Sequence, residues 1–251
     1  IVAGKGHEKI QEYKKIKKLF SDQQQILKNI TIKNKTLSSN IKLNILKELS
    51  NSNNISSKLK IENASINSKE IKKNSIFFAL RGKNKNGNLF VNEALAKGAS
   101  LVIVNNQKKS KKKIVVKNTL KFLTEASSIL RENLPSKIIS ITGSCGKTSL
   151  KELTGKCLNK ISQTTYSPKS FNNKFGVPLS LFNLKEDDDF GIFEIGMDKK
   201  GEIDYLSKII NPDVGVITNI SYAHIKNFKN INQIALAKSE IIKNIKKEGY
   251  L

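Results

Sequence analysis

Apolar residues recur along the chain in two spacings, and each spacing predicts one kind of secondary structure. Short apolar runs predict buried strands, at residues 75–80, 101–104, 138–142, 191–195 and 214–217. Apolar positions three and four residues apart predict helices, at residues 41–49, 89–97, 120–132, 147–159, 202–210 and 231–245. From residue 137 onward strands alternate with helices, which is typical of an α/β fold with a mainly parallel sheet.

Glycine, proline and polar stretches interrupt this pattern and divide the chain into segments. The first residues open with a strand-like run and a glycine turn and then become Lys-rich, and they are too few to bury a core of their own. A Ser-, Asn- and Lys-rich linker with one helix follows, and Pro135 then separates two α/β domains. We therefore predict four segments, at residues 1–30, 31–60, 61–135 and 136–251. The last segment is expected to be incomplete, because another strand should begin at Tyr250.

Composition excludes several classes of protein. The 251 residues are 38% hydrophobic and 26% charged, which fits neither a disordered chain nor a membrane protein. The apolar runs are far shorter than the roughly 20 residues that a membrane span needs, and the apolar start is too short for a signal peptide. Two cysteines fit the reducing cytosol better than a disulfide scaffold, so we expect a cytoplasmic protein.

The formal charge of +24 suggests a nucleic-acid partner at first sight, but its distribution argues against one. Of the 45 basic residues only Arg81 and Arg131 are arginines, whereas nucleic-acid surfaces concentrate arginine and aromatic residues on one element. The densest run, at residues 108–113, lies between two strand-like segments and predicts a solvated loop. A basic nucleic-acid binder stays the non-enzymatic alternative, and the steep salt dependence of phosphate contacts would reveal it in an oligonucleotide titration.

Residues 142–149 read Thr-Gly-Ser-Cys-Gly-Lys-Thr-Ser and join a predicted buried strand to a predicted helix. Such a turn points backbone N–H groups and the positive end of the helix at phosphate oxygens. The spacing is G-x-x-G-K-T rather than G-x-x-x-x-G-K-[ST], so the usual P-loop pattern is not met. We favour a phosphate loop over a chance glycine turn, with Lys147 on the terminal phosphates and the Thr148 hydroxyl on Mg²⁺. The predicted nucleotide-binding residues are Gly143, Ser144, Cys145, Gly146, Lys147, Thr148 and Ser149.

Two further side chains are candidates for chemistry because each interrupts an apolar pattern. Glu194 stands within a strand-like run, where an unpaired carboxylate is costly, so a metal ion is a fitting partner; a solvent-facing Glu is the alternative. Lys238 stands within the apolar stripe of the last helix, where burial would lower its pKa and make it a reactive neutral amine. A lysine that extends to the surface is the alternative. His224, in the loop after residues 214–217, is by itself typical of an ordinary loop histidine.

Taken together, these motifs resemble those of the Mur ligase family, the ATP-dependent enzymes that build the peptide of peptidoglycan. Residues 136–251 resemble the family's central ATP-binding domain, an α/β domain of the P-loop type. Residues 61–135 resemble its N-terminal α/β domain, which binds the UDP-sugar peptide, although residues 67–69 read Asn-Ser-Lys where Asp-Ser-Arg is usual. The runs at 171–179 and 196–203 are most similar to the MurF branch of the family, whose members add D-alanyl-D-alanine.

The resemblance implies an ATP- and Mg²⁺-dependent ligase that acts on UDP-N-acetylmuramoyl-tripeptide and D-alanyl-D-alanine in cell wall synthesis. ATP would phosphorylate the terminal carboxylate of the tripeptide, and the amine of D-alanyl-D-alanine would attack the acyl phosphate. Thr148 and Glu194 would hold one Mg²⁺ ion, while His224 and a carbamylated Lys238 would hold a second. The implied catalytic residues are Lys147, Glu194, His224 and Lys238, and the implied substrate-binding residues include Ser68, Asn172 and Asn173. Neither a nucleic acid nor a membrane is expected as a partner.

The first segment resembles the carboxyl end of MurE, the preceding ligase of the same family, which adds diaminopimelate or lysine. The run Gly4-Lys5-Gly6-His7-Glu8 carries this resemblance, and it implies that Gly4 and Glu8 bind the incoming amino acid. The chain would then be the junction of a MurE–MurF fusion, truncated at both ends, and we expect such a fragment to be inactive alone. Another ligase of the superfamily, MurE-type or similar to folylpolyglutamate synthases, is the enzymatic alternative, which the run 172–179 disfavours.

Overall fold

The structure is a computed structural model that describes residues 10–13, 16–19, 40–52, 54–82, 85–105, 110–222 and 227–251. The chain forms two compact units, Ile1–Ile41 and Lys42–Leu251. In the first unit, β1 (Ile10–Tyr13) and β2 (Ile16–Leu19) pair as an antiparallel hairpin. Periodicity did not predict this hairpin, because each strand has only four residues and mixes charged with apolar ones. The strand expected at residues 1–3 lies outside the described residues.

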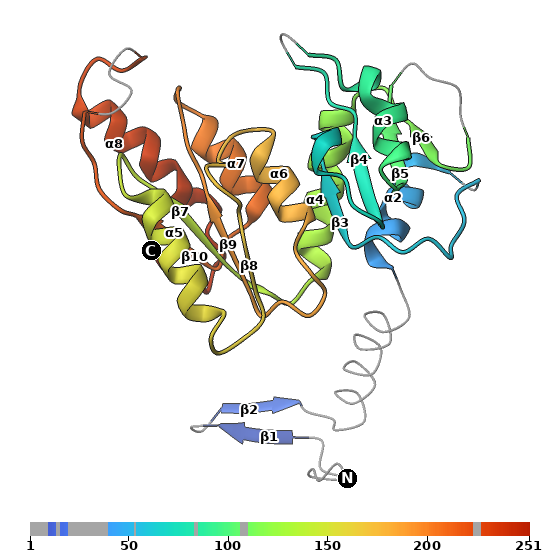
Figure 1. Ribbon diagram of the computed structural model, residues 1–251. Coiled ribbons are helices and arrows are strands. Elements are labelled where there is room, and N and C mark those ends of the chain that lie inside the picture. The colour runs from blue at the N-terminus through green and yellow to red at the C-terminus, as the bar shows by residue number, and fades with distance from the viewer. Residues whose placement is uncertain are drawn as a thin grey trace. The chain divides into compact units, whose positions relative to one another are not determined.

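The second unit contains two sheets, and the strands within each sheet are parallel (Figure 1). The first sheet has the order β3-β4-β5-β6 and comprises β3 (Asn63–Ser65), β4 (Ser75–Phe78), β5 (Ala99–Val104) and β6 (Lys113–Val115). The helices in this part of the chain are α2 (Ile41–Ser50), α3 (Val91–Ala96) and α4 (Thr119–Asn133), with short 3₁₀ turns η1 (Ser68–Glu70) and η2 (Gly87–Phe90). Apolar side chains of β4, α3 and β5, among them Phe77 and Val102, form a buried core.

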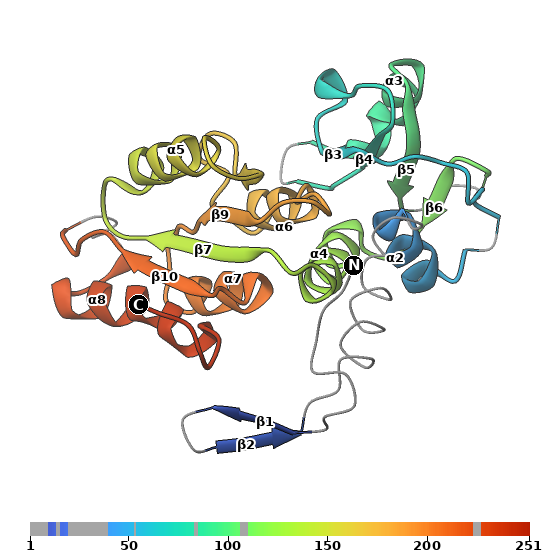
Figure 2. The ribbon, with the colours of Figure 1, turned by 90° about the horizontal axis from the view of Figure 1, so that it is seen from below.

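The second sheet has the order β10-β7-β9-β8. Its strands are β7 (Lys137–Thr142), β8 (Thr164–Tyr166), β9 (Phe190–Glu194) and β10 (Val214–Ile217). The helices are α5 (Lys147–Leu158), α6 (Gly176–Phe182), α7 (Glu202–Ile210) and α8 (Ile231–Ser239), which continues as the 3₁₀ helix η4 (Glu240–Asn244). Figure 2 shows α5 on one face of this sheet and α7 and α8 on the other. Because the strands are parallel, their carboxyl ends share one edge, which is where such sheets bind ligands.

Contacts between α6 and the first sheet join the two halves of this unit. The Asn183 side chain, just after α6, accepts a hydrogen bond from the Ala64 N–H at 2.6 Å and donates one to the Ala64 carbonyl at 3.0 Å. The rings of Phe78 and Phe182 meet edge to face, with centroids 5.5 Å apart. The buried Ser127 hydroxyl of α4 donates to the Pro178 carbonyl at 2.7 Å. Polar and aromatic contacts therefore fix α6 against both the first sheet and α4.

The α/β fold with parallel sheets is confirmed, and the predicted elements differ from the structure mainly at their ends. The helix predicted at 231–245 ends at Ser239 as an α-helix and tightens into a 3₁₀ helix, and the helix predicted at 89–97 likewise begins with a 3₁₀ turn. Gly98 ends α3 with a φ of +98°, as its position predicts. Periodicity missed β3 and β8, which have three residues each, and α6, whose residues are all buried and so show no polar face. The strand β6 falls in the second of the two strand-like segments expected on either side of the charged run.

The described part of the chain contains no helix that is both long and apolar enough to span a bilayer. In the predicted solvated loop, the described residues 110–112 are exposed, and Lys113 begins β6.

One buried charge cluster ties the amino end of the second sheet to α4 and α7. The Arg131 side chain of α4 is 3% exposed and donates to Asp213 Oδ2 at 2.7 Å. Arg131 also donates to the carbonyl oxygens of Ile210 and Ser136, at 3.0 and 3.1 Å. Asp213 in turn accepts hydrogen bonds from the Ile138 N–H at 2.8 Å and from Lys246 at 3.2 Å. Each charge is paired and hydrogen-bonded, which is the condition under which burial is tolerated.

We predict that Asp213→Asn lowers the free energy of unfolding by about 3 kcal/mol at pH 7, because it leaves Arg131 buried without its counter-charge. Burial alone would raise the pKa of Asp213, but the Ile138 N–H, Lys246 and Arg131 outweigh it and hold the pKa below its usual value. The contribution of Asp213 is therefore present above about pH 4 and is lost as the pH falls through the folded-state pKa. Urea unfolding at pH 7 and at pH 3 measures this, with the exposed Asp187→Asn as control. A difference between wild type and Asp213→Asn that does not shrink in acid would contradict the assignment.

Candidate functional site

The predicted phosphate loop joins β7 to α5 in two left-handed turns that require glycine. Gly143 has a φ of +142° and Gly146 a φ of +78°, which L side chains rarely adopt. A Cβ atom at Gly143 would also lie 1.9 Å from Thr218 Oγ1, whereas Gly146 has no neighbour within 4 Å and needs glycine for its φ alone. Gly146 is the N-cap of α5 and makes no side-chain cap, so it leaves the first-turn N–H groups to other partners.

Residues after β10 hold this loop from the other side. Asn219 Oδ1 accepts hydrogen bonds from the N–H groups of Ser144 and Cys145, at 3.2 and 3.0 Å, and Asn219 Nδ2 donates to Cys145 Sγ at 2.8 Å. The Thr218 hydroxyl donates to the Cys145 carbonyl at 2.6 Å. Two amides predicted to face phosphate therefore bond to a protein carboxamide in this structure.

Glu194 lies at the carboxyl end of β9 and is 1% exposed, so the alternative of a solvent-facing carboxylate is wrong. Its Oε2 accepts a hydrogen bond from the Thr148 hydroxyl at 2.7 Å, and its Oε1 accepts one from Asn172 Nδ2 at 2.8 Å. Three predicted site residues from three separate elements thus meet at one carboxylate. Carboxylate and hydroxyl oxygens are ligands that suit Mg²⁺, which usually takes one or two carboxylates and completes its shell with water and phosphate.

The described residues contain no group of three His, Cys, Asp or Glu side chains that could hold a metal ion. His224 lies outside the described residues, and so do Gly4 and Glu8, so their predicted roles stay predictions. Any metal ion at Glu194 and Thr148 would therefore depend on further ligands from substrate, solvent or the undescribed residues.

Two lysines converge on the first glycine of the loop. Lys147 Nζ donates to the Gly143 carbonyl at 2.9 Å, and Lys238 Nζ donates to the same oxygen at 2.8 Å. Lys238 is 2% exposed, so the alternative of a lysine that extends to the surface is wrong. Burial, and then the nearby charge of Lys147, lower the pKa of Lys238 to about 8. A larger share of Lys238 is consequently a neutral amine at pH 7 than for an ordinary lysine.

These groups border a cavity of about 600 Å³. The phosphate loop, residues 172–175 and the turn before α7 line it, together with Lys238. The buried Glu240 shapes this turn, because its carboxylate accepts hydrogen bonds from the N–H groups of Gly201 at 2.9 Å and Asp204 at 3.2 Å. Sequence reasoning gave Glu240 no role, although it stands only two residues after Lys238 in the helix predicted at 231–245.

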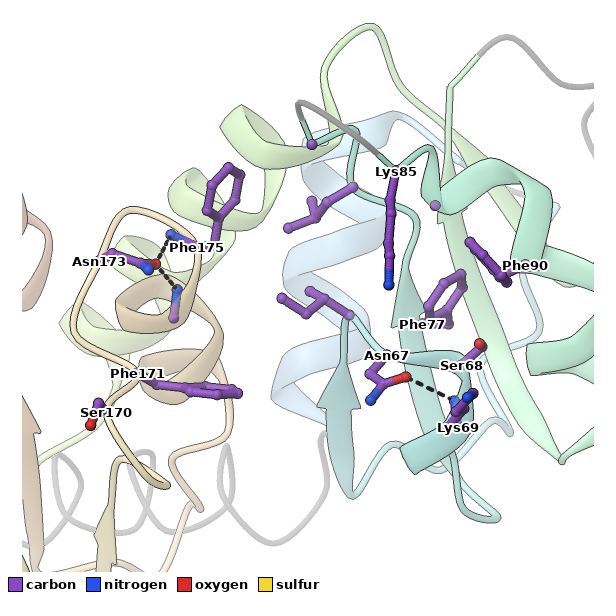
Figure 3. A pocket seen from close by; sticks show the side chains of 15 residues that line it. Asn67, Ser68, Lys69, Phe77, Lys85, Phe90, Ser170, Phe171, Asn173 and Phe175 are labelled. Carbon is purple, nitrogen blue, oxygen red and sulfur yellow. Dashed lines mark hydrogen bonds between the residues drawn. The ribbon is translucent and has the colours of Figure 1, made fainter.

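A second cavity, of about 500 Å³, lies between the first sheet and the start of α6 (Figure 3). Four aromatic side chains line it, Phe77, Phe90, Phe171 and Phe175, together with polar residues that include Asn67, Ser68, Lys69 and Lys85. The predicted substrate residues divide between the two sites: Ser68 lines this cavity, Asn172 contacts Glu194, and Asn173 lines both cavities. Asn173 Oδ1 also accepts hydrogen bonds from the N–H groups of Phe175 and Gly176, each at 3.0 Å, which fixes the start of α6.

Two family models match the chain: the Mur ligase middle domain over residues 141–251 and the Mur ligase family catalytic domain over residues 60–133. The chain is 36% identical over 194 residues to a UDP-N-acetylmuramoyl-tripeptide–D-alanyl-D-alanine ligase of Buchnera aphidicola, covering 76% of this chain and 42% of the relative. It is 40% identical over 196 residues to the ligase of the same name from Rickettsia prowazekii, covering 77% and 43%. The chain thus spans less than half the length of these relatives.

Solved structures show the same likeness. A crystal structure of MurF from Acinetobacter baumannii superposes with a TM-score of 0.71 at 31% identity, covering 82% of this chain and 47% of that one. A structure of MurF from Thermotoga maritima in complex with ADP gives a TM-score of 0.65 at 30% identity, covering 78% and 47%.

We predict that Gly143→Ala weakens ADP binding by more than about tenfold, since the added methyl group would force the loop away from Thr218. Isothermal titration with ADP measures the effect. Gly82→Ala is the matched control, because its added Cβ would meet nothing closer than 3.6 Å and its φ is ordinary. Unchanged affinity in a folded Gly143→Ala protein would show that the loop does not bind phosphate.

Proposed function

This chain belongs to the Mur ligase family, and we propose that it carries the nucleotide site and the UDP-sugar-peptide site of a MurF-type ligase. The reaction we propose joins D-alanyl-D-alanine to UDP-N-acetylmuramoyl-tripeptide at the expense of ATP, in the cytoplasm, as a step of peptidoglycan synthesis and so of cell shape and division. The observation that carries the proposal is the contact of Glu194 with both Thr148 and Asn172, because it joins the phosphate loop to the segment most similar to MurF.

In this proposal the phosphate loop binds ATP, and Lys147 turns from the Gly143 carbonyl to the terminal phosphates. A carboxylate oxygen of the tripeptide attacks the terminal phosphorus, and ADP leaves. The amine of D-alanyl-D-alanine then attacks the acyl carbon, which releases inorganic phosphate and one proton. Lys147 favours the first step because its positive charge neutralises charge on the transferring phosphoryl group.

We propose that Glu194 and Thr148 hold one Mg²⁺ ion through their oxygens, and that His224 contributes to a second site. Bound Mg²⁺ would neutralise phosphate charge and orient the terminal phosphoryl group. Asn172 keeps Glu194 in position from the opposite oxygen, so that Oε2 stays directed at the helix that follows the phosphate loop.

Lys238 is proposed to act as a carbamate. Its lowered pKa favours the neutral amine, which adds to the carbon of carbon dioxide with loss of a proton and becomes an anionic oxygen donor. Such an anion, once formed, would lie near Lys147, whose positive charge would stabilise it.

The second cavity is proposed to bind the UDP-sugar part of the substrate. Its aromatic side chains offer faces on which a pyrimidine ring can stack, and Lys69 and Lys85 supply positive charge for a diphosphate. Asn173 lines both cavities and so stands where the sugar-linked peptide would pass from one to the other. The first segment is proposed to be the end of a MurE-like ligase, with Gly4 and Glu8 on its amino acid substrate.

We predict that Lys147→Ala weakens ADP or ATP binding roughly 10- to 100-fold without unfolding the chain, as loss of charged hydrogen bonds to phosphate would do. Nucleotide titration measures the affinity and circular dichroism monitors the fold. Lys156→Ala is the control, because Lys156 lies exposed on the same helix. If Lys147→Ala binds nucleotide as tightly as wild type does, the phosphate-loop assignment fails.

We predict that Lys238→Ala abolishes ligation in a protein extended to the length of its relatives, and that bicarbonate does not restore it. A short carboxylic acid, which can supply an anionic oxygen, should restore part of the activity. Lys238→Arg should be inactive too, because a guanidinium cannot form the carbamate. Full activity of Lys238→Arg, measured by mass spectrometry of the product, would leave Lys238 with only the role of holding the Gly143 carbonyl.

A further inference from the structure

Lys151 is a buried cation that the proposed reaction does not use. It lies one turn after Lys147 in α5, and its side chain is fully buried. Its Nζ donates to the carbonyl oxygens of Ser167 at 2.6 Å and Lys169 at 2.5 Å, and it lies 3.0 Å from Glu152 Oε1. Three donors therefore meet three acceptors, which accounts for the burial of a charge that would otherwise be costly.

The two carbonyl groups belong to the segment 167–173, which runs from β8 towards α6. Ser167 anchors its start: its N–H donates to the Ile192 carbonyl at 3.0 Å, and its hydroxyl accepts from the Glu194 N–H at 3.4 Å. The backbone is left-handed at Lys169, with a φ of +49° that a non-glycine residue adopts only when its surroundings impose it. Lys151 bonds to the carbonyl of this same residue and so stabilises the strained turn.

The far end of the segment reaches both cavities. Asn172 donates to Glu194 Oε1 at 2.8 Å, and its carbonyl accepts from the Gly196 N–H at 2.8 Å. Ser170, Phe171 and Asn173 line the second cavity, and Figure 3 shows them on the side opposite Asn67 and Phe90. A shift of the turn at Lys169 would therefore displace groups at the metal-binding carboxylate and in the second cavity together.

The helix α5 is also held close to β8 at Gly155, one turn after Lys151. A Cβ atom at Gly155 would lie 2.6 Å from the Tyr166 ring, so only glycine allows this approach. Positions 151 and 155 lie four residues apart on one face of the helix. The face that carries Lys151 is thus the face fixed against the strand that leads into the segment.

We propose that Lys151 is a positioning residue, which fixes the segment 167–173 to the phosphate-binding helix and so couples occupancy of the two cavities. The inference rests on the proposed function, because it takes the first cavity as the nucleotide site and the second as the UDP site. Lys151 is not among the residues that line either cavity, so its effect would reach the ligands through Asn172, Phe171 and Asn173.

The experiment titrates the whole chain with UDP, with ADP, and with ADP plus Mg²⁺, for wild type, Lys151→Met, Lys151→Gln and the exposed control Lys156→Met. Lys151→Met should weaken UDP binding about tenfold. The factor by which Mg²⁺ increases the affinity for ADP should fall by a similar amount. ADP affinity without Mg²⁺ should change little, since Gly143 and Lys147 are untouched. Lys151→Gln, which keeps a donor, should lie between Lys151→Met and wild type, and Lys156→Met should match wild type.

Thermal unfolding distinguishes a positioning role of Lys151 from a role in stability alone. A lower unfolding temperature with unchanged UDP affinity and unchanged Mg²⁺ benefit, measured well below that temperature, would overturn the inference. A wild-type chain that binds neither UDP nor ADP would instead contradict the proposed function.

Hydrogen exchange on the unaltered chain tests the coupling even if the variants do not fold. UDP should slow amide exchange in α5 as well as at residues 167–173. Protection confined to the walls of the second cavity would overturn the coupling.

Discussion

The buried carboxylate of Glu194 is the contact on which the arrangement of the site depends. A charge at 1% exposure is stable only with partners, and the structure supplies a hydroxyl from α5 and a carboxamide from the segment before α6. Each partner occupies a different carboxylate oxygen, so the side chain cannot rotate without losing one of them. The Glu194 side chain of the second sheet therefore contacts both the phosphate-binding helix and the MurF-like segment and helps to set their relative position.

Periodicity predicted the elements that carry one polar and one apolar face, and it failed where that contrast is missing. The helix α4 was predicted to within one residue at each end, because its buried positions recur on one face. By contrast, α6 is buried on every side, and its sequence Gly-Val-Pro-Leu-Ser-Leu-Phe contains no contrast to detect. Strands of three residues such as β8 are shorter than one full alternation pattern, so tertiary pairing rather than local sequence defines them.

The sequence predicted those site residues whose type is unusual for their position in a strand, turn or helix. Three features stood out: glycines before a Lys-Thr pair, a glutamate in an apolar strand and a lysine in an apolar stripe. In the structure these residues lie together at one edge of the second sheet. Lys151 and Glu240 did not stand out, because a lysine or glutamate in a charged helix looks like a solvated residue. Their burial follows from backbone groups of distant segments, such as the Ser167 carbonyl and the Gly201 N–H, which a single sequence does not bring together.

The reciprocal hydrogen bonds between Asn183 and Ala64 have a consequence for association between chains. The strand β3 is an outer strand of its sheet, and such strands offer unpaired N–H and C=O groups to any extended chain that approaches. The Asn183 carboxamide presents one acceptor and one donor to Ala64, which is the pattern that a neighbouring strand would present. The Asn183 side chain thus takes the place of a fifth strand at Ala64, the middle residue of β3. It prevents another molecule from extending the sheet by pairing with β3 at this residue.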